Sequence, residues 1–192
     1  MAALINVGSN YLIGGKTPSR WGNAHPNIVP YQNFKSADGY LVIGAASEVI
    51  SKRFCEAIGR TDLTDDARFD SNSKRVENRV ELIELLSELF TQRDNETWFK
   101  LLTQAEVPCA PVQTIDQVFK APQVLHREML MEVEHPTAGK VPMAGIPVKF
   151  SVTPASVRLP PPLLGEHNGE ILKSWLGMSD EAVDELKSEK IL

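Results

Sequence analysis

The sequence predicts an α+β fold. An alternating run over 31–35 and an apolar run over 40–44 flank a short turn and predict an antiparallel hairpin. Apolar residues at spacings of three and four over 73–90 predict an amphipathic helix. Hydrophobic residues make up 42% and charged residues 23% of the 192-residue chain, a mix typical of soluble globular domains. A largely disordered or fibrous chain is therefore excluded.

The first predicted element is a helix over Met1–Ile13, ended by Gly14 and Gly15, because glycine suits the left-handed cap of a helix. The helix lacks an N-cap and an acidic first turn, which is typical of a segment cut from a larger domain. A loop rich in Gly, Asn and Pro follows over 16–30. The apolar face of the helix would consist of Leu4, Ile5, Tyr11 and Leu12.

The hairpin turn is expected at 37–39, with Gly39 free to take a positive φ. A helix over 47–58 would begin at Ser47 as N-cap, end at Gly59, and turn Val49, Phe54 and Ile58 inward.

A charged turn over 65–72 leads into the single helix predicted over 73–90, and a further helix is predicted over 95–105. The inward positions of the long helix would be Val76, Val80, Ile83, Leu86 and Phe90.

The C-terminal third alternates short elements with turns. Thr114 is expected to cap a short helix carrying Ile115, Val118 and Phe119. Three prolines at 160–162 predict an extended linker. The remaining expected elements are strands over 129–134, 140–143 and 147–150 and helices over 168–176 and 179–187.

The charge and length of the chain limit its partners. The net charge of −5 argues against nucleic acid, since phosphate binding needs a basic face. The apolar start is too short to cross a bilayer, so no membrane association is expected.

Cysteine and histidine spacing predicts no metal site. Cys55 and Cys109 form no CxxC pair and are expected to be buried free thiols, Cys55 in a helix core. His126, His135 and His167 are too scattered to form a zinc site.

The loop over 21–27 is the one candidate binding segment, with His25 at its centre. Its Gly and Asn residues could offer backbone N–H groups to a carboxylate or an oxyanion. An ordinary connecting loop has the same composition, and both interpretations stay open. Since the carboxylates fall in turns or on helix faces, composition and spacing alone reveal no active site.

Seven segments match one enzyme family in order along the chain. They are 22–32 (GNAHPNIVPYQ) with 37–40 (ADGY), 72–79 (NSKRVENR), 107–112 (VPCAPV), 122–124 (PQV), 134–139 (EHP with Gly139), 145–151 (GIPVKFS) and 160–167 (PPPLLGEH). Together they resemble the family III CoA-transferases, the formyl-CoA transferase and L-carnitine CoA-transferase family. The resemblance covers almost the whole chain, but only the C-terminal half of such an enzyme.

The resemblance implies nucleophilic catalysis by an aspartate. The aspartate attacks an acyl-CoA thioester, CoA thiolate returns to give an aspartyl-CoA thioester, and an acceptor carboxylate reverses the sequence. That aspartate lies in the family's N-terminal Rossmann-like half and matches no residue of this chain, which is expected to be inactive alone. The loop that closes on the intermediates maps onto Gly22, Asn23, Ala24 and His25, where formyl-CoA transferase has a run of glycines.

The resemblance also implies substrates and partners. Segments 9–12 and 122–126 are most similar to a mitochondrial branch that moves CoA between succinyl-CoA and dicarboxylic acids such as glutarate or hydroxymethylglutarate. Coenzyme A would then be a substrate, with no cofactor and no metal. A homodimer of interlocked chains is expected of the full-length family, and the cytoplasm is the alternative compartment. A racemase-branch member (2-methylacyl-CoA racemase-like) and a non-catalytic interaction module are the alternative functions.

Three parts are expected on the same basis. Residues 1–19 would be the end of the Rossmann-like large domain and a linker. Residues 20–125 would be the family's small α+β domain, and 126–192 the segment returning to the large domain with its C-terminal helices.

Overall fold

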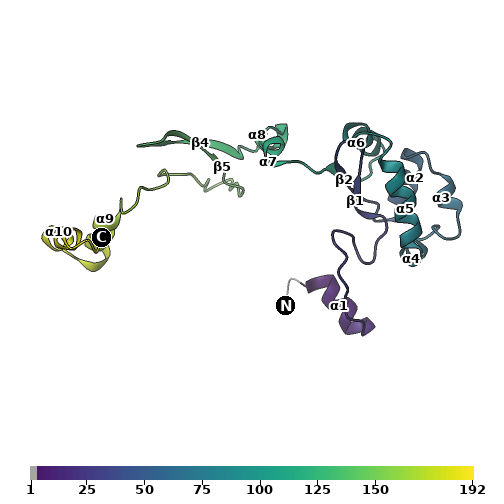
Figure 1. The fold of residues 1–192 in the computed structure, drawn as a ribbon, viewed down its shortest axis with the longest axis horizontal. Coiled ribbons are helices and arrows are strands. Elements are labelled where there is room, and N and C mark those ends of the chain that lie inside the picture. Colours follow the sequence, from purple (N-terminus) through teal and green to yellow (C-terminus); the bar gives the residue numbers. More distant parts are fainter. Residues whose placement is uncertain (1–3) are drawn as a thin grey trace. The chain divides into compact units, whose positions relative to one another are not determined.

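A computed structural model describes residues 4–192, and residues 1–3 of the first predicted helix lie outside the described residues. The chain forms two compact units, Met1–Gln113 and Thr114–Leu192 (Figure 1). Helices accompany two small antiparallel sheets, one in the order β1-β2-β3 and one made of β4 and β5. The predicted α+β class is thereby confirmed, whereas the three-part division at residues 19 and 125 stays a prediction.

The first unit begins with helix α1 (Ile5–Gly14). As predicted, a glycine ends it: Gly15 has a φ of 69°, and its N–H donates to the Tyr11 carbonyl at 2.8 Å. No residue of α1 is buried. The expected apolar face is therefore exposed in this chain, with Leu12 at 81% and Ile5 at 75%.

The predicted hairpin is confirmed. Strands β1 (Tyr31–Lys35) and β2 (Tyr40–Gly44) pair antiparallel, with Phe34 opposite Leu41 and both buried. A third strand, β3 (Cys109–Pro111), pairs antiparallel with β2 and was not predicted. Its three residues are too few to show an alternating pattern.

Gly39 lies close to the Asn95 side chain, and the prediction of a positive φ was wrong. A Cβ atom built on Gly39 would lie 2.7 Å from Nδ2 of Asn95, a clash with the first residue of helix α6 (Asn95–Gln104). Asp38 fixes the same junction, because its carboxylate accepts from the Asn95 N–H at 2.8 Å and the Ser36 hydroxyl at 3.0 Å.

The helix predicted over 73–90 is broken at Asn78, whose φ and ψ are −103° and 26°. Two helices result, α4 (Asn72–Glu77) and α5 (Arg79–Phe90). The break changes which positions face inward: Leu82 is buried with Leu86 and Phe90, whereas Val80 is 69% exposed.

Two other helices complete the first unit. Helix α2 (Glu48–Ala57) begins where predicted, since the Ser47 hydroxyl accepts from the Ile50 N–H at 3.2 Å. Phe54 and Ile58 face inward as predicted, but Val49 is 63% exposed. A short helix, α3 (Asp62–Asp65), starts before the region predicted as a charged turn.

The core of the first unit is aromatic. The Phe90 ring lies 5.0 Å from Phe34, 6.2 Å from Phe54 and 4.8 Å from Trp98, measured between ring centroids. The Trp98 indole N–H donates to the Phe90 carbonyl at 2.9 Å, so its polar atom is satisfied inside the core. This cluster joins β1, α2, α5 and α6, which lie together in Figure 1.

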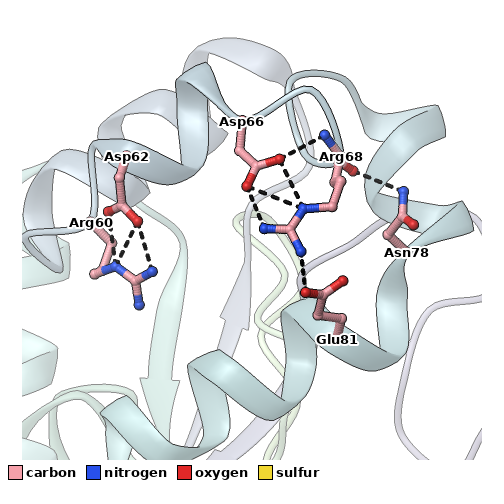
Figure 2. Close-up of polar contacts among 6 residues, drawn as sticks. All are labelled: Arg60, Asp62, Asp66, Arg68, Asn78 and Glu81. Atoms are coloured by element: carbon pink, nitrogen blue, oxygen red, sulfur yellow. Dashed lines mark hydrogen bonds and ion pairs between the residues drawn. The ribbon is translucent and has the colours of Figure 1, made fainter.

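An exposed ionic network holds the segment between α3 and α4 (Figure 2). Arg68 donates to both oxygens of the Asp66 carboxylate, through Nη2 at 2.6 Å and Nε at 3.0 Å, and also pairs with Glu81 of α5. The Arg68 carbonyl accepts from the Asn78 amide at 3.1 Å. Hydrogen bonds from the Arg68 side chain and from its backbone N–H lower the pKa of Asp66 to about 2.

Asp66 is therefore expected to add a pH-dependent contribution to stability. Its folded pKa lies below the unfolded value of about 3.9, so the contribution is complete above pH ~4 and is lost as the pH falls toward 2. NMR titration of the side-chain carboxyl should give a midpoint near 2, and Asp66→Asn should flatten the acid dependence of unfolding between pH 4 and 2. A midpoint near 4 in the intact chain would show that the Arg68 pairing does not persist in solution.

The second unit contains four helices and one hairpin among its described residues. The hairpin strands β4 (Leu130–His135) and β5 (Gly139–Ala144) pair antiparallel. They correspond to the strands predicted over 129–134 and 140–143. The strand predicted over 147–150 was wrong, since these residues take no strand conformation. The helices are α7 (Ile115–Val118), α8 (Pro122–His126), α9 (Asn168–Leu176) and α10 (Asp180–Ser188).

Local signals set the helix ends in this unit. Thr114 caps α7 as predicted, and its N–H donates to the Gln117 side chain at 2.9 Å. Gly177 ends α9 in the left-handed conformation, with a φ of 66°. Val183 of α10 is 1% exposed, and Lys173 pairs with Asp180 across the α9–α10 turn.

Candidate functional site

The predicted substrate-loop residues Gly22, Asn23, Ala24 and His25 form one turn, which residues 26–30 connect to β1. Gly22 takes a φ of 62°, and the Ala24 N–H donates to the Trp21 carbonyl at 3.0 Å. The turn is tied to the sheet twice: the His25 N–H donates to the Tyr31 carbonyl at 2.9 Å, and the Asn33 N–H donates to the Asn23 side chain at 2.9 Å. The loop therefore has a defined conformation.

The His25 ring stacks on a neighbour. Its centroid lies 5.4 Å from that of Tyr31, with 5° between the ring planes. Nδ1 accepts from the Asn27 N–H at 3.1 Å, so the proton of the neutral ring belongs on Nε2. The N–H groups of Ala24, His25 and Asn27 already have acceptors within the loop and β1, and in this conformation they are not offered to a ligand.

Three polar side chains from one motif bind the backbone that follows the turn. Asn72 donates to the Asn27 carbonyl at 2.8 Å and accepts from the Val29 N–H at 3.2 Å. Arg75 Nε donates to the Val29 carbonyl at 2.8 Å. Arg79 Nη2 donates to the carbonyls of His25 at 3.2 Å and Pro26 at 2.8 Å.

We call these three residues, Asn72, Arg75 and Arg79, the backbone clamp. They lie in the NSKRVENR segment, one of the seven that resemble the family. The sequence alone predicted no role for these three side chains. Their spacing of three and four residues is that of one helix face, and this is the signal that could have revealed them. The clamp explains why a Gly- and Pro-rich segment is held in one conformation.

Arg75 is the buried member of the clamp, with a relative exposure of 4%. It also donates to the Phe69 carbonyl at 3.1 Å and to the Glu48 carboxylate at 3.0 Å. Desolvation raises the pKa of Glu48, but the hydrogen bonds from Arg75 and the Asn72 N–H outweigh it, and the pKa falls below its usual value. A cavity of about 210 Å³ adjoins this pair and is lined partly by Ser51 and Cys55.

A larger groove of about 580 Å³ runs between α1 and the loop, and Trp21, Pro26 and Asn27 form the loop's contribution to its walls. Among the described residues lining the groove, Lys16 carries a charge and none is Asp or Glu. The hydroxyls of Ser9, Thr17 and Ser19 and the amides of Asn10 and Asn27 supply hydrogen-bonding groups. Val7, Ile13 and Trp21 also line the groove, so it suits a ligand with an apolar part, and Lys16 favours an anionic group on that ligand.

The two thiols are free, as predicted, and neither is poised for nucleophilic chemistry. Burial raises the pKa of Cys55 to about 11, and it also raises the pKa of the half-buried Cys109. Across residues 4–192, no cluster of three His, Cys, Asp or Glu side chains is arranged to hold a metal ion. The same residues include no helix with the length and apolar character needed to traverse a bilayer.

The chain is similar to known CoA-transferases along its whole length. It is 42% identical over 192 residues to succinyl-CoA:glutarate CoA-transferase from Homo sapiens, covering 100% of this chain and 44% of that protein. It is 39% identical over 163 residues to succinyl-CoA:mesaconate CoA-transferase from Haloarcula marismortui, covering 84% of this chain and 40% of that protein. The chain thus spans less than half the length of these relatives.

The fold gives the same result. A crystal structure of a CaiB/BaiF family protein from Brucella suis superposes with a TM-score of 0.71 at 36% identity, covering 88% of this chain and 44% of that one. The sequence profile of "CoA-transferase family III" matches residues 1–168. The resemblance drawn from the seven segments is confirmed, and the chain belongs to CoA-transferase family III.

Proposed function

We propose that this chain is part of an enzyme that moves CoA between succinyl-CoA and a dicarboxylic acid such as glutarate or hydroxymethylglutarate. The observation that carries the proposal is the 42% identity, over the entire chain, to a relative named for succinyl-CoA and glutarate. The groove beside the loop adds support, because its hydroxyls, amides and Lys16 suit a carboxylate-bearing substrate.

The reaction divides the work between two parts of the enzyme. An aspartate outside the segments matched here would attack the thioester carbonyl, and CoA thiolate would leave. The thiolate would return to the anhydride, release the first acid and form an aspartyl-CoA thioester. The acceptor carboxylate would then repeat the exchange in reverse. Gly22 to His25 and the groove would shape the acyl site in which these exchanges occur.

The wider assembly follows from the same resemblance. Acyl-CoA and dicarboxylic acid are the substrates, with coenzyme A as a substrate and no separate cofactor. We propose a mitochondrial, homodimeric enzyme in which residues 20–125 form the small domain. Segments 9–12 and 122–126, which resemble the mitochondrial branch, support the compartment.

The test places this chain in a complete enzyme, joined to or combined with an N-terminal half that carries the family's aspartate. Succinyl-CoA and glutarate are supplied, and glutaryl-CoA is measured by liquid chromatography. Gly22→Val should lower kcat about tenfold or more, because a β-branched residue at a φ of 62° is strained and would displace the turn.

Gly22→Asn is the matched control. Asparagine tolerates the left-handed conformation, and a Cβ atom at Gly22 meets no atom within 4 Å. This variant should therefore fold normally and separate backbone strain from side-chain bulk. A wild-type kcat in both variants would show that residues 22–25 are an ordinary connecting loop without a role in catalysis. An assembled enzyme that makes no glutaryl-CoA or other dicarboxylyl-CoA would refute the proposed function.

A further inference from the structure

Arg79 is the member of the backbone clamp that reaches the substrate loop itself. The three members bind successive parts of one strand of backbone: Asn72 and Arg75 hold the part nearest β1, and Arg79 holds the carbonyls of His25 and Pro26. His25 is the last residue of the proposed loop. Arg79 is thus the contact through which α5 acts on the loop's position.

The same guanidinium also holds the other end of the turn. Its central carbon lies 4.3 Å from the centroid of the Trp21 ring, a cation–π arrangement. Trp21 precedes Gly22, and Pro26 follows His25. One side chain therefore fixes both residues that flank the four-residue loop, and both of them line the groove.

The environment of Arg79 makes this contact stronger than a surface pairing. Burial lowers the pKa of Arg79 by desolvation, and the guanidinium, like that of other arginines, stays charged at neutral pH. Arg79 contacts two carbonyl oxygens and an aromatic face, all of which are neutral groups. The planar guanidinium of arginine suits this combination, because its N–H groups donate at the edge of the plane while its face covers an aromatic ring.

We propose that Arg79 is a positioning residue for the CoA-transfer reaction, setting the distance between the Trp21–Pro26 wall and the bound acyl group. This inference rests on the proposed function of the loop. It goes further by assigning the loop's placement to one side chain on α5, which need not touch the substrate. Positioning the loop requires both the N–H donors of the guanidinium and its flat face over Trp21, so the single charge of a lysine should not be enough to position it.

The experiment compares Arg79→Met and Arg79→Lys with Arg93→Met as matched control. Arg93 also lies over an indole, 5.0 Å from the Trp98 centroid, but this contact is away from the loop. Hydrogen exchange of the 192-residue chain comes first. The Ala24 and His25 amides should exchange about tenfold faster in Arg79→Met, because their turn loses its anchor, while the Ile43 amide in β2 changes less than twofold.

Steady-state kinetics of the assembled enzyme, with glutarate varied, supply the second measurement. Arg79→Met should lower kcat about tenfold with a smaller change in KM, Arg79→Lys should recover only part of kcat, and Arg93→Met should leave kcat within twofold. Faster loop exchange with unchanged kcat would reduce Arg79 to a structural residue and overturn the inference. Full activity in Arg79→Lys would overturn the requirement for a guanidinium. If the wild-type assembly is inactive, the proposed function fails, and the exchange data alone decide whether Arg79 holds the loop.

Discussion

The purified 192-residue chain is expected to show no turnover of succinyl-CoA and glutarate above the uncatalysed rate. Covalent transfer needs a carboxylate nucleophile, and the family's aspartate has no counterpart among the seven matching segments. Removing a nucleophile abolishes the covalent route rather than slowing it, so the loss should exceed about a millionfold. The measurement is glutaryl-CoA formation by liquid chromatography, at enzyme concentrations that would reveal a few turnovers per hour.

Two controls make this result interpretable. Circular dichroism and the emission of buried Trp98 establish that the chain is folded, since Trp98 is 1% exposed whereas Trp21 and Trp175 are 43% and 83% exposed. Adding an N-terminal half that carries the aspartate should produce activity. Turnover by the folded chain alone would mean that one of its own carboxylates acts as nucleophile, and Asp→Asn and Glu→Gln scanning would then identify it.

Arg75→Met is expected to cost the first unit about 2–4 kcal/mol of unfolding free energy. The substitution keeps an extended side chain but removes two hydrogen-bond donors. In the native chain, buried Arg75 donates to the Val29 carbonyl at 2.8 Å and to the Phe69 carbonyl at 3.1 Å. Each buried carbonyl left without a donor costs roughly 1–3 kcal/mol, and loss of the Glu48 pairing adds little, since Glu48 is 58% exposed. Urea unfolding followed by Trp98 fluorescence measures the change.

Glu48→Gln is the matched control for Arg75→Met. Glutamine has one acceptor oxygen, which can serve either the Asn72 N–H, 2.8 Å from Glu48 Oε1, or Arg75, 3.0 Å from Glu48 Oε2, but not both. Because this variant leaves the Arg75 bonds to the Val29 and Phe69 carbonyls intact, it should lose less stability than Arg75→Met. An Arg75→Met variant as stable as the control would show that water from the adjoining cavity replaces the lost donors, and that the clamp does not depend on Arg75.

Local sequence signals determined much of the secondary structure. The Ser47 and Thr114 caps and the helix stop at Gly15 depend on residues within about four positions of one another, and the hairpin pairs neighbouring runs joined by one short turn. Such features can be predicted because turns, caps and alternation are short-range interactions. The family could be recognised for a different reason: seven short segments in a fixed order form a pattern that one local signal does not provide.

Hydrophobic periodicity gave the wrong inward-facing residues where tertiary contacts determine which side of a helix is buried. The pattern over 73–90 suited one continuous helix, but Asn78 interrupts it, and its amide donates to the carbonyls of Arg68 and Lys74. Leu82 then turns inward and Val80 outward. Likewise, Gly39 was expected for its conformational freedom, whereas in the structure it has no positive φ and lies against the Asn95 side chain, which is far along the chain.

The sequence by itself determined the α+β class and the family, and from the resemblance it predicts a substrate loop at residues 22–25. Only the tertiary structure decided how that loop is held. Its clamp joins residues 43 to 54 positions apart, from the Asn72 bond to Val29 to the Arg79 bond to His25. Hydrogen bonds and ring contacts act over a few ångströms, so partners this distant along the chain interact only once the fold has placed α4 and α5 against the segment before β1.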